Sequence, residues 1–135
     1  MSDEDVEHLR ELHEMCFGDS APQVTYDKGA WWLVYKAGDP EPVGFAGIVP
    51  STLGTGYAYL KRSGVLPPHR GHGLQRRLIT LRERWARKEG FHTVVSDTCE
   101  NTPSANNLIR KGYVLFDPKT PWTLKGGLYF KKSLS

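Results

Sequence analysis

The sequence predicts an α/β fold with a mixed, mostly antiparallel sheet, a central parallel strand pair and flanking helices. The main observation is a strand, a helix and a strand in succession over residues 56–97. A crossover of this length makes its two strands parallel, with a right-handed connection. The second observation is a pair of apolar runs, 31–35 and 43–49, joined by KAGDPEP, whose Gly, Asp and Pro residues suit a hairpin.

The first element is predicted to be a helix over residues 3–15. Ser2 or Asp3 can cap its N-terminus, and the acidic residues of its first turn suit the helix dipole. Apolar residues recur every three positions along it: Val6, Leu9, Leu12 and Met15. The polar segment FGDSAPQVTYDKGA that follows is predicted to be a loop with room for one helical turn.

After the hairpin, residues 56–65 are expected to form a third strand, because they are rich in aromatic residues and partly alternating. Gly64 stands where a bulge or a close backbone approach would be tolerated. The C-terminal elements are expected to be a strand over 92–97, a helix from Pro103 through Lys111, and strands over 113–116 and 127–134.

The helix expected between the strands over 56–65 and 92–97 has the clearest periodicity, and Gly90 ends it. Its apolar stripe consists of Leu74, Leu78, Ile79, Leu81, Trp85 and Ala86. The basic residues fall off this stripe and are interleaved with Glu83 and Glu89, a pattern typical of a solvated face. These basic residues are Arg76, Arg77, Arg82, Arg84, Arg87 and Lys88.

Length and composition predict one soluble domain spanning residues 1–135. No run approaches the roughly 20 apolar residues that a membrane span needs, and the acidic start of the chain is unlike a signal peptide. Cys16 and Cys99 are far apart and no Cys/His spacing resembles a zinc site, so we expect no metal and a reducing cytoplasmic setting. The formal net charge of +3 is mild, which argues against nucleic acid as a partner.

The turn RGHGLQ follows the strand over 56–65, at the place where ligands collect in parallel α/β sheets. Gly71 and Gly73 permit backbone angles that other residues avoid, so that successive N–H groups can converge on an anion. The N-terminus of the next helix adds about half a positive charge along the same direction. The turn is therefore a candidate phosphate site, although glycines also serve ordinary tight turns.

VLPPHRGHGLQRRL resembles the acyl-CoA loop of the GNAT superfamily of N-acetyltransferases, in which Val-x-Pro leads into R/Q-x-x-G-x-G/A and an amphipathic helix. The matching residues are Val65, Pro67, Arg70, Gly71, Gly73, Leu74 and Leu78. Gln75 departs from the motif, which has a small residue there. PVGFAGI resembles the third strand of the family, and NTPSANNLIRKGYVLF resembles its second signature through Asn101, Ser104, Gly112 and Tyr113.

The resemblance covers about residues 31–133 and implies an acyl-CoA N-acyltransferase-like fold with acetyl-CoA as cosubstrate. The family's usual first strand is missing, which leaves one sheet edge bare or filled by a second copy of the chain. Backbone groups of Val65 and Leu66 would pair with the pantetheine arm, and Asn101 and Ser104 would add cofactor contacts. Loop amides would bind the diphosphate: Arg70, Gly71, His72, Gly73, Leu74, Gln75 and Arg76.

The implied reaction is direct attack of a neutral primary amine, on a small molecule or a peptide, on the acyl thioester. An alkylamine with a pKa of about 10 is neutral only about one part in a thousand at pH 7. Forming the neutral amine therefore costs roughly 4 kcal/mol, and a base is needed to accept its proton. In many family members a carboxylate on the fourth strand accepts this proton. The corresponding strand here, YAYLKRSGV within residues 56–65, contains no Asp or Glu. Tyr59 near that position and Asp97 on the next strand are the candidate catalytic residues, with a packing aromatic and a turn-forming Asp as the alternatives.

The Tyr that often acts as the acid in the family is replaced by Leu108. Tyr113, Cys99 or water could protonate the leaving thiolate, or it could leave unaided because a thiol pKa is near about 8.5. His69 and His72 are expected to face solvent or phosphate. Three tryptophans could line an acceptor pocket or pack in the core: Trp31, Trp32 and Trp122.

Two other functions stay open. A catalytically impaired acyl-CoA-binding module with a regulatory or interaction role is favoured by Leu108 and by the absence of an acid on the strand over 56–65. Nucleic-acid binding through the basic helix face is disfavoured by the interleaved glutamates. The acceptor cannot be read, because the loops over about 17–30 and 117–126 carry no diagnostic motif, and the acidic first helix suits either a cationic acceptor or solvent.

Overall fold

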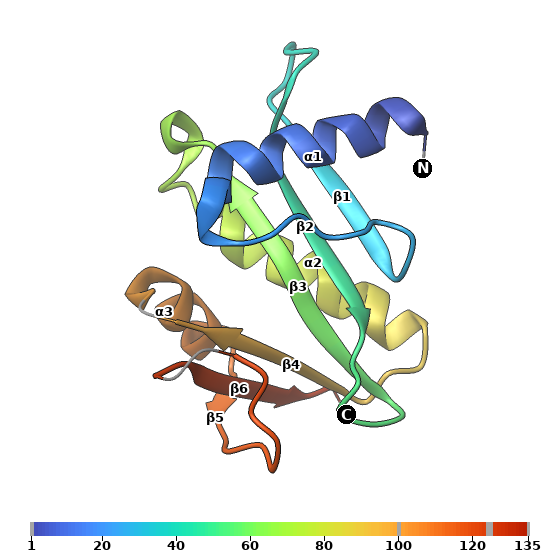
Figure 1. The fold of residues 1–135 in the computed structure, drawn as a ribbon, viewed down its shortest axis with the longest axis vertical. Helices are drawn as coiled ribbons and strands as arrows, with labels where there is room; N and C mark the ends of the chain where they lie inside the picture. Colours follow the sequence, from blue (N-terminus) through green and yellow to red (C-terminus); the bar gives the residue numbers. More distant parts are fainter. Residues whose placement is uncertain (1, 100, 124–125, 135) are drawn as a thin grey trace. The chain divides into compact units, whose positions relative to one another are not determined.

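The computed structural model describes residues 2–99, 101–123 and 126–134 and has the α/β fold with flanking helices (Figure 1). Across these ranges the mixed sheet has six strands in the order β1-β2-β3-β4-β6-β5. The elements in chain order are α1 (Asp3–Phe17), β1 (Ala30–Tyr35), β2 (Pro42–Pro50), β3 (Tyr57–Val65), α2 (Leu74–Lys88), β4 (Thr93–Thr98), α3 (Thr102–Arg110), β5 (Val114–Leu115) and β6 (Leu128–Ser133).

Each helix and strand expected from the sequence is present, with small shifts of its ends. The first helix runs on to Phe17, and the single turn expected in the following loop is a 3₁₀ turn over Gly18–Ser20. The strand expected over 113–116 is reduced to Val114–Leu115. The chain therefore follows the predicted order of elements, including the crossover from β3 through α2 to β4.

The chain forms two compact units, which are described one at a time. The first unit contains the residues up to Val49 together with Lys61–Gln75, so it holds α1, β1, β2, the end of β3 and the loop before α2. Figure 1 shows α1 running across β1 and β2. The apolar stripe of α1 packs there, and the resulting core contains Leu9, Leu12, Trp31 and Phe45.

A capping box begins α1, as its sequence predicts. The backbone N–H of Asp5 donates to Ser2 Oγ at 3.1 Å, and the Asp5 carboxylate accepts from the backbone N–H of Ser2 at 3.4 Å. Two of the N–H groups that a helix start leaves unpaired are thus satisfied.

The antiparallel pair β1–β2 depends on a glycine opposite a tryptophan. Trp31 stands opposite Gly47 in the register, and a Cβ at Gly47 would lie 2.4 Å from the Trp31 ring. Gly64 on β3 is in a similar position, because a Cβ there would lie 2.6 Å from the sulfur of Cys16. The close approach expected at Gly64 is therefore confirmed, with α1 as the neighbouring element.

The second unit contains Pro50–Leu60 and the chain from Arg76 onward. Its centre is the parallel pair, in which β3 and β4 are in register from Tyr57↔Thr93 to Tyr59↔Val95. The other side of β4 pairs antiparallel with β6, and β5 then pairs with β6 at the end of the sheet (Figure 1).

The buried face of α2 differs from the expected stripe. Arg82 and Glu83 were expected on the solvated face, but they are only 3% and 2% exposed, whereas Leu81 and Trp85 are half-buried. Glu83 Oε1 accepts from Lys132 Nζ at 3.1 Å, and Arg82 Nε donates to the carbonyl of Leu78 at 3.0 Å. The prediction was wrong at these positions because a charged side chain with such partners can occupy the inner face of a helix.

Within the described ranges, neither the length nor the hydropathy of any helix would let it cross a bilayer. The same residues contain no group of three or more His, Cys, Asp or Glu side chains arranged to hold a metal ion.

Candidate active site

The glycine loop joins the end of β3 to the start of α2 within the first unit, except for the helix residues beyond Gln75. A 3₁₀ turn over Pro67–His69 follows β3, and the next segment contains two left-handed glycines, Gly71 at φ +86° and Gly73 at φ +73°. Other residues rarely adopt such angles, so both glycines are needed for this path. Because α2 begins at Leu74, the loop amides lie just before a helix N-terminus, the arrangement that binds anions.

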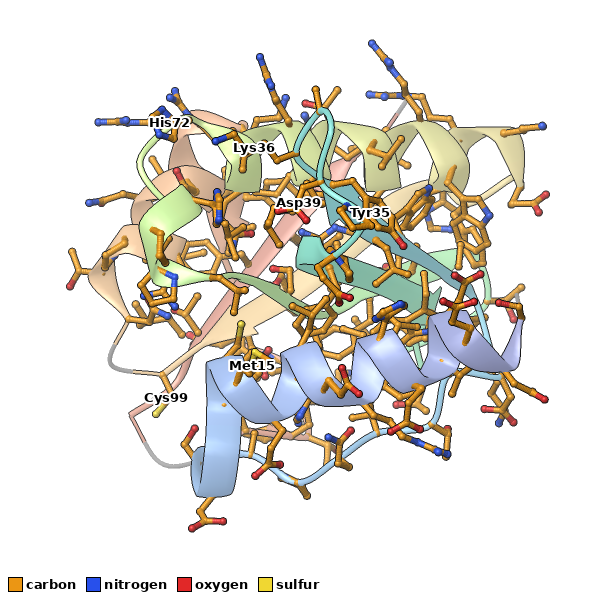
Figure 2. All side chains as sticks on the ribbon, turned by 90° about the horizontal axis from the view of Figure 1, so that it is seen from above. Met15, Tyr35, Lys36, Asp39, His72 and Cys99 are labelled. Atoms are coloured by element: carbon orange, nitrogen blue, oxygen red, sulfur yellow. The ribbon has the colours of Figure 1, made fainter. Side chains whose placement is uncertain are left out.

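Space around the loop suits a ligand at its backbone. No atom outside its immediate neighbours in the described chain lies within 4 Å of a Cβ placed on Gly71. His72 is exposed, and Figure 2 shows it at the surface of the loop before α2. His69 is half-buried.

Arg70 connects the loop to the strand that precedes it. Its Nε donates to the carbonyl of Val65 at 2.7 Å. The backbone N–H of Leu66 donates to the carbonyl of Val43 at 2.9 Å, so Leu66 faces β2. Since neighbouring residues of a strand point their backbone groups to opposite edges, Val65 rather than Leu66 presents its backbone to the other edge of β3.

Cys16, near the end of α1, lies close to Gly64 of β3 and to Arg70 of the loop. Burial raises the pKa of its thiol, and the nearby Arg70 guanidinium partly offsets that rise. The thiol is therefore kept protonated at neutral pH, where it packs as a small apolar side chain.

Gln75, the departure from the loop motif, turns toward β3. Its Oε1 accepts from the hydroxyl of Ser63 at 3.0 Å. The side chain of Gln75 is thus held by a strand residue of its own unit, and the backbone path of the loop is unaffected.

The second unit brings the two candidate catalytic residues together. The hydroxyl of Tyr59 donates to Asp97 Oδ1 at 2.8 Å, although the residues are 38 positions apart in the sequence. The parallel register explains the contact, because Tyr59 pairs with Val95 and Asp97 is two residues further along β4. A carboxylate held by a hydroxyl near the carboxyl end of a parallel strand is a suitable place for proton transfer.

Trp122 completes this arrangement and is the residue whose specific contact the sequence did not predict. Its indole Nε1 donates to Asp97 Oδ2 at 3.0 Å, so each carboxylate oxygen accepts one hydrogen bond. Trp122 lies before β6 in a segment without periodicity. The one feature of the sequence that could have indicated this contact is an aromatic N–H donor within a candidate acceptor loop.

Asn101 and Ser104 form the cap of α3. Asn101 Oδ1 accepts from the backbone N–H of Ser104 at 3.1 Å, and Pro103 stands in the first turn. Asn101 is therefore the N-cap of α3, and the role of both residues in cofactor binding stays a prediction.

The remaining candidates for the acid differ in exposure. Leu108 is buried, and Tyr113 is only 3% exposed. Burial and the neighbouring Glu83 carboxylate raise the pKa of Tyr113 far above its ordinary value, which makes it a poor proton donor. Cys99, the other side chain considered as the acid, is exposed after β4 (Figure 2).

Trp31, which was expected either to line an acceptor pocket or to pack in the core, belongs to the core of the first unit.

Comparisons with known proteins were made at the level of families, of curated sequences and of solved structures. The family model described as Acetyltransferase (GNAT) family matches residues 3–113. A comparison with curated protein sequences finds no significant match. Solved structures with the same fold include ribosomal-protein-S18-alanine N-acetyltransferase from Escherichia coli, with 15% identity, a TM-score of 0.74 and coverage of 100% of this chain and 91% of that chain.

Two further structures share the fold. An acetyltransferase from Agrobacterium tumefaciens str. C58 matches with 18% identity and a TM-score of 0.71 over 98% of this chain and 86% of that chain. The protein yncA from Salmonella typhimurium, solved with its cofactor acetyl-CoA, matches with 21% identity and a TM-score of 0.58 over 71% of this chain and 60% of that chain. With the family model spanning most of its length, the chain belongs to the acetyltransferase (GNAT) family, a family of acyltransferases.

Proposed function

We propose that the chain is a single N-acetyltransferase domain over residues 1–135 that transfers an acetyl group from acetyl-CoA to a primary amine in the cytoplasm. Membership in the GNAT family supports acyl transfer, and the structure of yncA with acetyl-CoA supports the choice of cosubstrate. The observation that carries the mechanism is the Asp97 carboxylate, which accepts hydrogen bonds from both Tyr59 and Trp122.

In this proposal the glycine loop binds the diphosphate of acetyl-CoA. The proposed donors are the backbone amides of Gly71, His72, Gly73, Leu74, Gln75 and Arg76. The Arg70 amide, also expected to contribute, instead donates to the carbonyl of Pro67 at 3.3 Å. A hydrogen bond to a charged acceptor contributes about 1.5–3 kcal/mol, so a few of these amides suffice for firm binding. The pantetheine arm would lie along Val65, since the backbone N–H of Leu66 is already paired with Val43 of β2. Cofactor contacts from Asn101 and Ser104 stay predictions.

Asp97 is the proposed proton acceptor. The ammonium form of the acceptor loses one proton to the Asp97 carboxylate. The lone pair of the resulting neutral amine forms the new C–N bond to the thioester carbonyl carbon, and the C–S bond breaks with its electron pair on sulfur. The second proton of the amine nitrogen then passes to the departing thiolate, which leaves an amide and the free thiol. Tyr59 and Trp122 hold the carboxylate in one orientation. A thiol with a pKa near about 8.5 can leave as thiolate at a cost of about 2 kcal/mol at pH 7, so the mechanism does not require Tyr113 or a residue at Leu108 as acid.

The alternative is a catalytically impaired acyl-CoA-binding module. The buried Leu108 at the usual Tyr position and the raised pKa of Tyr113 favour it. Such a module would bind acetyl-CoA and release no thiol with any amine.

The test is a thiol-release assay with acetyl-CoA across a panel of primary amines, using wild type, Gly73→Glu and Gly90→Glu. Both glycines have positive φ, so both substitutions strain the backbone, but Gly73 precedes α2 and Gly90 follows it. We expect release with at least one amine, a rise of at least about tenfold in the KM for acetyl-CoA in Gly73→Glu, and little change in Gly90→Glu. Binding of acetyl-CoA without release over the whole panel would favour the module, and full activity of Gly73→Glu would contradict the placement of the diphosphate.

A further inference from the structure

Two aromatic side chains of α1 hold the guanidinium of Arg62 in the first unit. Arg62 is on β3, whose end lies beside the last turns of α1 (Figure 1). Its Nε donates to His13 Nε2 at 3.4 Å, and its Cζ lies over the ring of Phe17, 5.7 Å from the centroid. The His13 and Phe17 rings stack on each other with centroids 4.8 Å apart. The cation is thus held by groups that carry no negative charge.

No carboxylate balances the charge of Arg62 in the part of the chain that the structure describes. The ion pairs found there have other cations: His8, Arg10 and Lys132. Arg62 is half-buried, so water hydrates its charge only in part. Because a half-buried cation without a counter-charge is under-solvated, a negative ligand at Arg62 gains more than it would at an exposed arginine.

His13 leaves most of the guanidinium available. Burial and the charge of Arg62 lower the pKa of His13, with a weaker opposite effect from Glu14, so the ring is neutral at pH 7. Its Nε2 occupies only the Nε–H of Arg62. The other four N–H donors of the guanidinium, on the two Nη atoms, have no acceptor among the described residues. Such a planar fork matches the two oxygens of a carboxylate.

A second arginine acts on the same surroundings but has a partner. Burial raises the pKa of Tyr26, and the charges of Arg10 and Arg62 partly offset that rise, so both charges reach the Tyr26 phenol. Arg10 Nη1 lies 3.8 Å from a carboxylate oxygen of Glu7. Of these two arginines, Arg62 is therefore the one whose charge is left for a ligand.

We propose that Arg62 binds a carboxylate of the amine acceptor, so that the substrate class is amino carboxylates, such as amino acids, rather than amines without an acid group. This inference rests on the proposed acyl transfer. The carboxylate accepts two parallel N–H bonds from the Nη groups of Arg62, and His13 is a positioning residue that holds Nε. Since the loop amides are the proposed place of the cosubstrate diphosphate, Arg62 is left for the other substrate.

Binding of matched probes tests the inference without turnover. Glycine, β-alanine and γ-aminobutyrate place the amine at different distances from the carboxylate, and each is compared with its own primary amide, which has nearly the same size. We titrate the full chain calorimetrically at pH 7, with and without CoA. At least one carboxylate should bind about tenfold or more tightly than its amide. Arg62→Gln should abolish this preference, and Arg62→Lys, which keeps the charge without the fork, should retain part of it.

Arg10→Gln is the matched control, because Arg10 belongs to the same unit and acts on the same tyrosine but already has Glu7 as partner. It should keep the wild-type preference. An equal loss in Arg10→Gln and Arg62→Gln would indicate a general positive field and overturn the inference. If circular dichroism shows that Arg62→Gln is unfolded, Arg62→Lys decides, and an undiminished preference in that variant is the contrary result.

The inference is also wrong if the carboxylates and amides bind equally, if none of them binds, or if the preference survives Arg62→Gln. Acetylation of the amides as efficiently as of the carboxylates would count against it while leaving acyl transfer intact. Selective carboxylate binding that depends on Arg62, without thiol release from acetyl-CoA, would support the carboxylate site and contradict the proposed function.

Discussion

Replacement of Tyr59 by Phe removes one hydrogen bond to Asp97 and leaves the ring in place. The hydroxyl donates to a carboxylate at 2.8 Å in a part-buried position. A hydrogen bond to a charged group contributes about 1.5–3 kcal/mol, and we expect the lower end here because water can reach and replace part of the lost contact. For a domain of this size a loss of about 1.5 kcal/mol lowers the Tm by roughly 5 °C.

The effect on catalysis follows from the position of the carboxylate. With only Trp122 as donor, Asp97 is free to rotate away from the amine, and misplacement of a reacting group by about 1 Å can cost up to 100-fold. We therefore expect kcat/KM for the amine to fall about 10- to 100-fold in Tyr59→Phe. Urea denaturation gives the stability, and thiol release from acetyl-CoA gives the rate.

Tyr57→Phe is the matched control, since Tyr57 is on the same strand and the described chain shows no hydrogen bond from its hydroxyl. Its ring contact with His92, at 5.1 Å between centroids, would be retained by Phe. If Tyr59→Phe proves as stable as Tyr57→Phe, the bond to Asp97 contributes nothing. If stability falls while kcat/KM is unchanged, the pair is structural and Asp97 is not the proton acceptor.

Three further expectations concern the framework of the fold. Lys132→Met leaves the buried Glu83 without its ion-pair partner at 3.1 Å, and the free energy of unfolding measured by urea denaturation should fall by about 3 kcal/mol. The double variant that adds Glu83→Gln should recover part of this loss. Gly47→Ala places a methyl group against the Trp31 ring in the core, and should lower the midpoint of denaturation by an amount equivalent to about 2–3 kcal/mol, whereas an unchanged midpoint would show that Trp31 can move aside. Burial and the nearby Arg62 charge lower the pKa of His13, so the native state binds fewer protons than the unfolded state below pH 6.5. The contribution of His13 to stability should therefore be constant above pH 6.5 and be lost as the pH falls through the native pKa. In His13→Phe the free energy of unfolding should fall less steeply between pH 6.5 and 5 than in the wild type.

Local pattern was sufficient for most of the fold. The stripe of Leu9 and Leu12 predicts the face that α1 buries, and the length of the crossover predicts that β3 and β4 are parallel. The face of α2 was misplaced by about one residue because Arg82 and Glu83 were assigned to solvent by their charge. The partner that allows Glu83 to be buried is Lys132, 49 positions away, and a pattern within one helix cannot reveal it.

The candidate site was predictable residue by residue but not as an arrangement. The sequence points to Tyr59 and Asp97 one at a time, each with a structural alternative, and their hydrogen bond depends on the register of β3 against β4. Trp122 comes from a segment with no period at all, so its contact with Asp97 follows only from the folded chain. Side chains that meet across strands and loops are therefore the part of a site for which composition and spacing carry the least information.

Gln75 shows how a larger residue can stand at a motif position without filling the space beside the loop backbone. A small residue at this position keeps side-chain atoms away from the anion, and Gln75 meets the same requirement in another way, because Ser63 holds its side chain against β3 at 3.0 Å. The backbone of the loop, with Gly71 and Gly73 in left-handed conformations, is then the surface left for the proposed diphosphate. The motif thus describes a need for space beside the backbone, and a larger residue can occupy the position when a neighbouring strand residue holds it aside.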